Sequence, residues 1–269
     1  MRTKRVAVVI PLYHNDLSKD EIFSLNCCTR ILCQHPIIVI QPDNLELGEI
    51  GKQYPSLNFE KFNPSFFNGR QGYNHLMLSQ ELYSRFIQYE YILIYQLDAL
   101  VFGDYLIDWC DKGYDYIGAP WLMKKSHGWF LYQKIFFPFR NYIYQQQGKP
   151  CKLPLPNVVG NGGFSLRKTS SHLNITTTFS NQCSLYINKS RYSRYFEDKF
   201  WALEAPLLSK QFKIPNWKEA LSFSFDKYPS LCYKKNHCQL PFGVHGFNKR
   251  KTKQFWKPIL KNMREEFCL

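Results

Sequence analysis

The stretch that decides the fold is Tyr91-Ile-Leu-Ile-Tyr-Gln-Leu-Asp98, an apolar run that ends in a carboxylate. A short, continuous apolar run predicts a strand that is buried on both faces. An Asp at the end of such a strand is costly to bury unless it binds something, and it suits a divalent cation that holds phosphate oxygens. The alternative is an Asp that caps the next turn or helix.

The segments before this strand alternate between strand and helix patterns. Arg5–Leu12 and Ile37–Gln41 are apolar and rich in β-branched residues, so both predict buried strands. Between them, Ser18-Lys-Asp-Glu21 forms a capping box, which predicts the start of a helix. Apolar side chains at helical spacing predict a further helix within Asn74–Tyr89. This order predicts an α/β domain with a mainly parallel sheet flanked by helices.

Four further elements are expected after Asp98. They are a helix over Tyr105–Asp111, a strand over Asp115–Gly118, a helix over Glu197–Ser209 that Pro206 kinks or ends, and a strand through Leu221, Phe223 and Phe225. Ligands of such a sheet bind beyond the carboxyl ends of its strands. The first strand leads into Pro11-Leu-Tyr-His-Asn15 without a glycine-rich loop, which argues against a Rossmann dinucleotide enzyme and a P-loop NTPase.

Composition and charge set further bounds. The chain has 269 residues, of which 45% are hydrophobic, and this excludes a disordered chain. No apolar run approaches the roughly 20 residues of a membrane-spanning helix, and the run near the N-terminus is too short for a signal peptide, so a cytoplasmic protein is expected. Lys and Arg number 35 against 21 Asp and Glu, and residues 116–196 hold eleven cations and no acid. An anionic partner or a solvated basic face would explain this excess.

Three later motifs carry candidate chemistry. Val159-Gly-Asn-Gly-Gly-Phe-Ser-Leu-Arg167 contains a glycine-rich loop whose backbone can approach a ligand closely. Glu197-Asp198 stands at an expected helix start, where an acid either complements the helix dipole or acts as general base toward a hydroxyl. A lone His is usually structural, and the flanking glycines raise only modestly the odds that His245 faces a ligand or metal.

Together these motifs resemble the nucleotide-sugar glycosyltransferases of the GT-A fold and, more narrowly, a bacterial family catalogued as a domain of unknown function and assigned to that fold. The residues that carry the resemblance are Gln71-Gly-Tyr-Asn74, Leu76-Met-Leu-Ser79, Tyr91–Ala99, Lys112–Trp121, Gly160–Lys168, Glu197-Asp198 and Phe242–Phe247. It implies a single GT-A-like, Rossmann-like domain over residues 1–248, with an aromatic and basic insertion at about 121–156 and a basic C-terminal tail over 249–269.

The resemblance also implies a metal site. The Asp-x-Asp motif of GT-A enzymes reads Gln96-Leu97-Asp98 here, so Asp98 is the expected direct ligand of Mn²⁺ or Mg²⁺, and His245 completes the metal shell. Gln96 takes the place of the missing first carboxylate and is expected beside the donor. Such a cation stabilises the diphosphate leaving group as the glycosidic bond breaks.

Further roles are implied by position. Asp198, with Glu197 beside it, matches the catalytic base of inverting members, and one carboxylate acting opposite the leaving group predicts inversion. Donor contacts are expected from Pro11 and Tyr13 at the nucleotide base, from Asn161, Gly162 and Gly163 along the donor and acceptor cleft, and from Gln71 and Asn74.

These roles predict a glycosyltransferase that moves a sugar from a nucleotide-sugar to a hydroxyl of a surface glycan such as lipopolysaccharide, O-antigen or capsule. The alternative is a non-enzymatic nucleic-acid binder, because basic residues interleaved with aromatics also suit single strands. No nucleic acid is expected as a partner, because no binding-module motif is present and the acids at 98, 197 and 198 would have no role.

The segment Trp121–Tyr144 holds nine aromatic residues, with Lys124, Lys125, Lys134 and Arg140 between them. Aromatics beside cations suit an anionic membrane surface and a lipid-linked glycan acceptor. We therefore expect a peripheral contact with the inner face of the cytoplasmic membrane. A loop packed on the sheet is the alternative.

Overall fold

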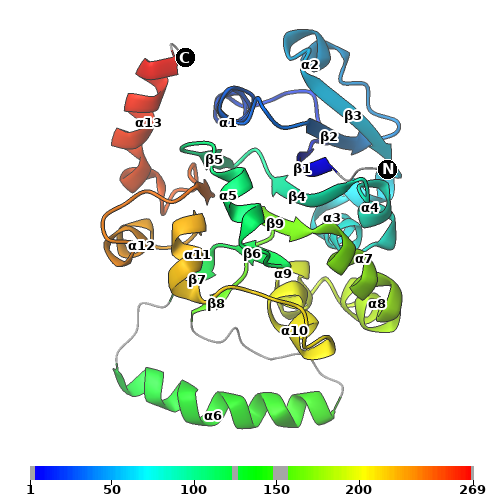
Figure 1. Ribbon diagram of the computed structural model, residues 1–269, viewed down its shortest axis with the longest axis vertical. Helices are drawn as coiled ribbons and strands as arrows, with labels where there is room; N and C mark the ends of the chain where they lie inside the picture. Colours follow the sequence, from blue (N-terminus) through cyan, green and yellow to red (C-terminus); the bar gives the residue numbers. More distant parts are fainter. Residues whose placement is uncertain (1–3, 123–126, 148–156, 268–269) are drawn as a thin grey trace.

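A six-stranded sheet runs through the centre of the protein (Figure 1). The structure, a computed structural model, describes residues 4–122, 127–147 and 157–267. In the order β3-β2-β1-β4-β9-β6, the strands span Leu57–Phe62, Ile37–Pro42, Lys4–Pro11, Tyr89–Tyr95, Phe164–Lys168 and Tyr116–Gly118. The first four pair in parallel and β9 runs antiparallel to both of its neighbours, which confirms the mainly parallel α/β sheet.

Side chains of β1 alternate between the two faces of this sheet, as the pleat of a strand requires. Val8 and Ile10 point into one core and Ala7 and Val9 into the other. The helices that cover the first face are α1 (Lys19–Ile31), α2 (Gly48–Gln53), α5 (Leu106–Asp111) and α11 (Trp217–Phe223). Those that cover the second are α3 (Gly69–Met77), α4 (Gln80–Arg85), α7 (Thr169–Thr178) and α8 (Ser180–Asn188).

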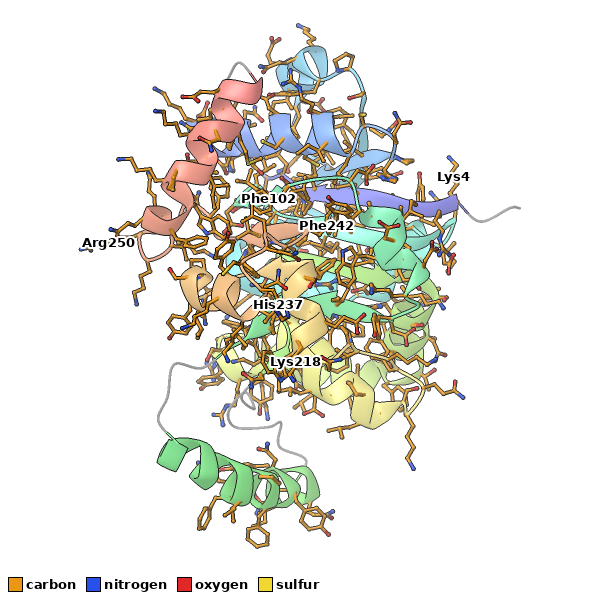
Figure 2. The ribbon with its side chains drawn as sticks, turned by 60° about the vertical axis from the view of Figure 1, so that its left-hand side comes forward. Lys4, Phe102, Lys218, His237, Phe242 and Arg250 are labelled. Atoms are coloured by element: carbon orange, nitrogen blue, oxygen red, sulfur yellow. The ribbon has the colours of Figure 1, made fainter. Side chains whose placement is uncertain are left out.

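A smaller, three-stranded sheet carries the late histidine. In the order β10-β11-β5, its strands span Ser224–Phe225, Gly243–His245 and Ala99–Val101. Phe102, which follows β5, donates its backbone N–H to the carbonyl of Phe242 at 3.0 Å, and the two residues lie close together in Figure 2. The antiparallel register pairs His245 with Ala99, the residue after Asp98, so strand pairing brings two distant motifs together.

The C-terminal helix α13 (Lys253–Phe267) packs against the small sheet. Trp256 is fully buried and stacks on Phe102, with ring centroids 5.6 Å apart. Leu260 and Met263 are buried in the same cluster. The basic tail therefore contributes one apolar helix face to the core. Helix α13 comes after α12 (Pro229–Lys235) and β11 in the chain.

One helix predicted within Asn74–Tyr89 is two helices in the structure, α3 and α4. The chain leaves the helical path at Leu78, and Ser79 adopts an extended backbone conformation. Its hydroxyl then accepts a hydrogen bond from the N–H of Leu82, which caps α4.

The late strand predicted through Leu221, Phe223 and Phe225 is wrong over most of its length, because Trp217–Phe223 is helix α11. The side chain of Asn216 accepts hydrogen bonds from the backbone N–H groups of Lys218 and Glu219 and so opens the helix. A local cap outweighs a short alternating pattern here.

The predicted insertion contains helix α6 (His127–Gln146), which lies apart from the other helices at the bottom of Figure 1. A two-stranded ribbon of β7 (Pro120–Trp121) and β8 (Val158–Val159) stands at its base. Lys124 and Lys125 lie outside the described residues. Over 4–122, 127–147 and 157–267, no helix is long and apolar enough to cross a membrane.

Candidate active site

A cavity of about 400 Å³ opens where β1 and β4 end, at the sheet edge where α/β proteins bind their ligands. Of the twelve site residues predicted from the sequence, ten line it: Pro11, Tyr13, Asn74, Gln96, Asn161, Gly162, Gly163, Glu197, Asp198 and His245. Strand ends and loops from distant parts of the chain therefore meet at one place, as expected.

Three side-chain atoms converge at this cavity, two of them on residues that line it, Gln96 and His245. The Nε2 atom of His245 lies 3.1 Å from Oδ1 of Asp98 and 3.3 Å from Oε1 of Gln96. Asp98 Oδ1 is buried, yet it accepts no well-aligned hydrogen bond from any described residue. Two ligand atoms that share one cation at about 2.1 Å each lie about 3 Å apart. These three atoms therefore fit a small divalent cation.

The surroundings of the three atoms support that fit. Asp226 Oδ1 lies 3.3 Å from the other ring nitrogen of His245, as in sites where a carboxylate orients a ligating His. A side chain at Gly163 would collide with both His245 Nε2 and Gln96 Oε1, so glycine keeps the space between them open. Among described residues no group of three His, Cys, Asp or Glu could hold a metal ion, so a cation between His245 and Asp98 would need the Gln96 amide oxygen as a further ligand.

Charges within this cluster are strongly coupled. Burial disfavours the charged form of Asp98, but His245 and Lys249 outweigh it and lower the pKa of Asp98 to about 2. Burial likewise opposes protonation of His245, but Asp226 and Asp98 raise its pKa to about 9. Lys249 Nζ lies 3.3 Å from Asp98 Oδ2. Asp98 is therefore a permanent carboxylate that attracts positive charge.

Glu197 lines the cavity and also belongs to a buried ion pair. Its Oε2 accepts a hydrogen bond from Arg167 at 2.9 Å, and both side chains are almost fully buried. Burial raises the pKa of Glu197 to about 7 in spite of Arg167. Burial also opposes the charge of Arg167, but Glu197 raises the pKa of Arg167, so the carboxyl is the group that titrates. Glu197 is thus suited to positioning its neighbour.

Two other predicted residues hold this pair in place. Asn74 accepts a hydrogen bond from the backbone N–H of Glu197 at 2.6 Å and donates to the Arg70 carbonyl at 2.7 Å, so it anchors the Glu-Asp motif to α3. At Gly162, any side chain would overlap the Glu197 carboxyl. The glycine-rich loop therefore accommodates the acidic motif as well as a ligand.

Asp198 has the features of a general base. Its Oδ1 is buried and accepts no hydrogen bond within the described part of the chain. Burial raises the pKa of Asp198. It lies in α9 (Glu197–Lys199), directly before a π-helical turn over Phe200–Glu204, and such turns are frequent at functional sites. A basic carboxylate with an unused oxygen can accept a proton from a bound hydroxyl.

A second cavity, of about 1180 Å³, lies on the other side of Asp198. The residues that line both cavities are Arg70, Asn161, Phe196, Asp198 and His245. A molecule in either cavity would therefore meet the same carboxylate.

Comparison with known proteins shows the family of the chain. Residues 56–245 match the model of a family described as "Protein of unknown function (DUF5672)". The chain belongs to this family. No curated protein matches the sequence.

The described fold of this DUF5672 member is also found in solved structures. Mouse xyloside xylosyltransferase 1 in its apo form aligns over 92% of this chain and 99% of its own, with 9% identity and a TM-score of 0.54. The glycosyltransferase GlyE of Streptococcus pneumoniae TIGR4 aligns over 93% of this chain and 56% of its own, with 13% identity and a TM-score of 0.48. At 9% identity the likeness to the xylosyltransferase concerns the fold alone, and it confirms the GT-A-like fold class.

Two predicted residues of this DUF5672 member lie outside the first cavity. Asp98 does not line this cavity, but its Oδ1 lies 3.1 Å from Nε2 of His245, which does. Gln71 is exposed and lines a separate, small cavity. On helix α3 it shares a face with His75, whereas Arg70 and Asn74 share the face that lines the first cavity. The structure does not bring Gln71 together with the other site residues.

Three site residues escaped the sequence prediction. Arg167 was inside the quoted glycine-rich motif but had no role, although a charged residue in an apolar strand signals a buried pair. Asp226 follows strand β10 as Asp98 follows β4, which is the signal that could have identified it. Lys249 is one of several cations in the tail, and nothing in the local pattern distinguishes it.

Proposed function

We propose that this protein is an inverting glycosyltransferase that moves a sugar from a nucleotide-sugar to a hydroxyl group of a glycan. The observation that carries the proposal is Asp198, a buried carboxylate with an unused oxygen on the wall between two cavities. Beside one cavity, side-chain atoms of Gln96 and Asp98 converge on His245. The likeness of fold to glycosyltransferases supports the same conclusion.

The donor would occupy the first cavity. Pro11 and Tyr13 stand at the end of β1 and would hold the nucleotide base, with the ring of Tyr13, 59% exposed, available for stacking. Gln96, Asp98 and His245 would hold Mn²⁺ or Mg²⁺, which when bound supplies electrostatic stabilisation of the leaving diphosphate. Lys249, 3.3 Å from Asp98, adds a second positive charge beside that position.

Asp198 would act on the acceptor. Its carboxylate takes the proton of the acceptor hydroxyl as that oxygen forms a bond to the anomeric carbon. The bond between this carbon and the phosphate oxygen breaks on the opposite side, and the nucleoside diphosphate leaves with the electron pair. Attack from one face and departure from the other inverts the anomeric centre. Glu197, held by Arg167 and Asn74, keeps Asp198 at the meeting point of the cavities.

Nucleotide binding tests the proposal at its base. Uridine diphosphate and guanosine diphosphate, each with Mn²⁺, should raise the melting temperature of the protein, and a panel of nucleotide-sugars should include one that it hydrolyses slowly. A single-stranded oligonucleotide serves as the comparison. Stabilisation by the oligonucleotide alone would refute the proposal in favour of a nucleic-acid binder.

The proposed acceptor is a surface glycan such as lipopolysaccharide, O-antigen or capsule, carried on a lipid at the inner face of the cytoplasmic membrane. Helix α6 supports this part. Ile135, Phe139 and Tyr142 recur at helical spacing, and each is well exposed, Phe139 to 66%. Figure 2 has side chains of α6 pointing away from the rest of the protein. An apolar helical face free of acids suits the interface of an anionic bilayer.

Liposome sedimentation tests the membrane contact. The protein should sediment with vesicles of phosphatidylglycerol and phosphatidylcholine more than with phosphatidylcholine alone, and Ile135→Ser with Phe139→Ser should reduce binding severalfold. Leu207→Ser, which changes an exposed apolar residue elsewhere, is the matched control. Equal and negligible binding to both vesicle types would rule out this contact.

A further inference from the structure

The second cavity differs in charge from the first. Six cationic side chains line it against two carboxylates, whereas the first cavity has one cationic side chain, Arg70, besides His245. The six are Arg70, Lys199, Lys227, Lys249, Arg250 and Lys251. The two carboxylates are already engaged, because Asp226 contacts His245 and Asp198 is the proposed base.

Several of these cations form no close ion pair, although Lys227 is near enough to Asp226 to lower the pKa of that carboxyl. Lys227, Arg250 and Lys251 form no ion pair with an acid anywhere in the described residues. Figure 2 places Arg250 at the surface, in the segment that leads into α13. Burial lowers the pKa of Lys199, Asp198 partly offsets this effect, and the nearby positive charge of Lys227 lowers the pKa further. Like charges held close together cost free energy unless an anion lies between them.

Contacts with neighbouring residues fix the positions of two of these cations, Lys199 and Arg70. Lys199 donates to the carbonyl of Ser193 at 2.5 Å, and both Lys199 and Arg70 lie over the ring of Phe196, at 5.7 and 5.1 Å from its centroid. Phe196 thus holds two of the six cations, of which Arg70 lines both cavities and Lys199 only the second. These two charges are placed by contacts, which favours binding of an anion beside them.

Two residues that line the second cavity, Tyr228 and Asn161, have a strained backbone conformation. Tyr228 follows Lys227 with a φ of 57° and a ψ of 54°, the left-handed region that bulky residues rarely adopt. Asn161, in the wall shared with the first cavity, has a φ of 69°. Residues held in such conformations cluster at binding and active sites. Trp121, Tyr228 and Phe255 add aromatic rings to the lining, and these suit the faces of sugar rings.

The geometry points to an acceptor that carries an anionic group, a phosphate or a carboxylate, close to the hydroxyl that receives the sugar. This inference rests on the proposed transferase function and names its acceptor class. The donor diphosphate does not account for the charge, because Lys199, Lys227, Arg250 and Lys251 line only the second cavity. An anionic acceptor would compensate these cations while its hydroxyl reaches Asp198, whereas a neutral glycan would leave them uncompensated.

Calorimetric titration with simple sugars tests the inference directly. The protein is held at saturating uridine diphosphate and Mn²⁺ in about 150 mM salt, so that the first cavity is filled and surface charge is screened. Glucose 6-phosphate, glucuronic acid and glucose are the probes. At least one anionic sugar should bind about tenfold or more tightly than glucose, and which of the two does so identifies the anion.

Variants locate the binding. The double variant Lys227→Gln with Arg250→Gln should weaken the anionic sugar about tenfold and leave uridine diphosphate unchanged. Lys234→Gln with Lys257→Gln removes the same charge from exposed residues outside the cavity and should change neither. Equal affinity for all three sugars, or an equal loss in both double variants, overturns the inference. Failure of every nucleoside diphosphate to bind would instead refute the proposed function, and the sugars are then titrated without nucleotide.

Discussion

Replacement of Asp198 by Asn separates the chemistry of this residue from its structural cost. The substitution keeps the shape of the side chain and removes its ability to accept a proton. Because Asp198 Oδ1 accepts no hydrogen bond from the described residues, little packing or bonding is lost. We therefore expect a folded protein that binds donor normally and transfers sugar poorly.

The expected loss of turnover follows from the role of a general base. Proton transfer by a positioned side chain contributes about 10²- to 10⁴-fold, so kcat should fall by that factor, equivalent to about 3–5 kcal/mol in the barrier. The KM for the donor should stay within about twofold, because Asp198 acts on the acceptor. Initial rates with a donor found in the nucleotide-sugar screen measure both.

The thermal stability of the Asp198→Asn variant should rise, whereas its turnover falls. Burial raises the pKa of Asp198 above its ordinary value of 3.8. The proton-linked contribution to stability is therefore fully present below about pH 4 and is lost as the pH rises through the pKa of the folded state. Asn carries no charge and avoids that loss. The melting temperature of the variant should equal or exceed that of the wild type at pH 7.5, and the gap should close near pH 4.

Two results would refute this reasoning. Turnover within about tenfold of the wild type would remove the role of base from Asp198. A melting temperature several degrees lower at pH 7.5 would reveal a stabilising contact that the structure does not contain. Asp108→Asn, at an exposed acid far from both cavities, is the control and should change neither quantity.

Three further substitutions test the neighbours of Asp198. Arg167→Met should lower the free energy of unfolding by about 3–5 kcal/mol in urea titration, because it leaves Glu197 buried without its partner. Gly163→Ala should fold normally but raise the Kd for Mn²⁺ about tenfold in calorimetry, because its methyl group enters the space between His245 and Gln96. Gln96→Glu should lower that Kd about tenfold, because a carboxylate of the same length replaces a neutral amide oxygen.

Each of these outcomes has a clear contrary. An Arg167→Met protein as stable as the wild type would mean that Glu197 is not held as a charge by that partner. Unchanged Mn²⁺ affinity in Gly163→Ala would place the cation elsewhere. Weaker Mn²⁺ binding in Gln96→Glu would mean that the amide oxygen is not a ligand.

Sequence reasoning succeeded where a strongly patterned strand fixes the position of the residues after it. The apolar run Tyr91–Tyr95 can only be a buried strand, so the position of Asp98 at the edge of the sheet could be predicted. The same logic applied to Pro11 and Tyr13 at the end of β1. Asn161 and Gly163 could be expected near a ligand because the glycines around them permit close approach.

Sequence reasoning was limited where the pairing of distant strands, or the exact start of a helix, decides which residues reach the site. Asp226 directly follows the predicted strand through Phe225, but its contact with His245 depends on the pairing of β10 with β11. Lys249 reaches Asp98 only because β11 pairs with β5. Gln71 was expected at the donor, but the point at which α3 begins decides which of its faces meets the cavity, and single-residue resolution at a helix start is beyond pattern reasoning.

Helix α13 acts as a brace for a site that it does not itself supply. Trp256 is wedged between Phe102, which follows β5, and Phe225 of β10, the two strands that flank β11. Because β11 carries His245, the distances between the proposed cation ligands depend on the packing of Trp256 between Phe102 and Phe225. Loosening of the last helix would therefore disable the site from a distance, and an affinity tag or fusion partner is better attached at the other end of the chain.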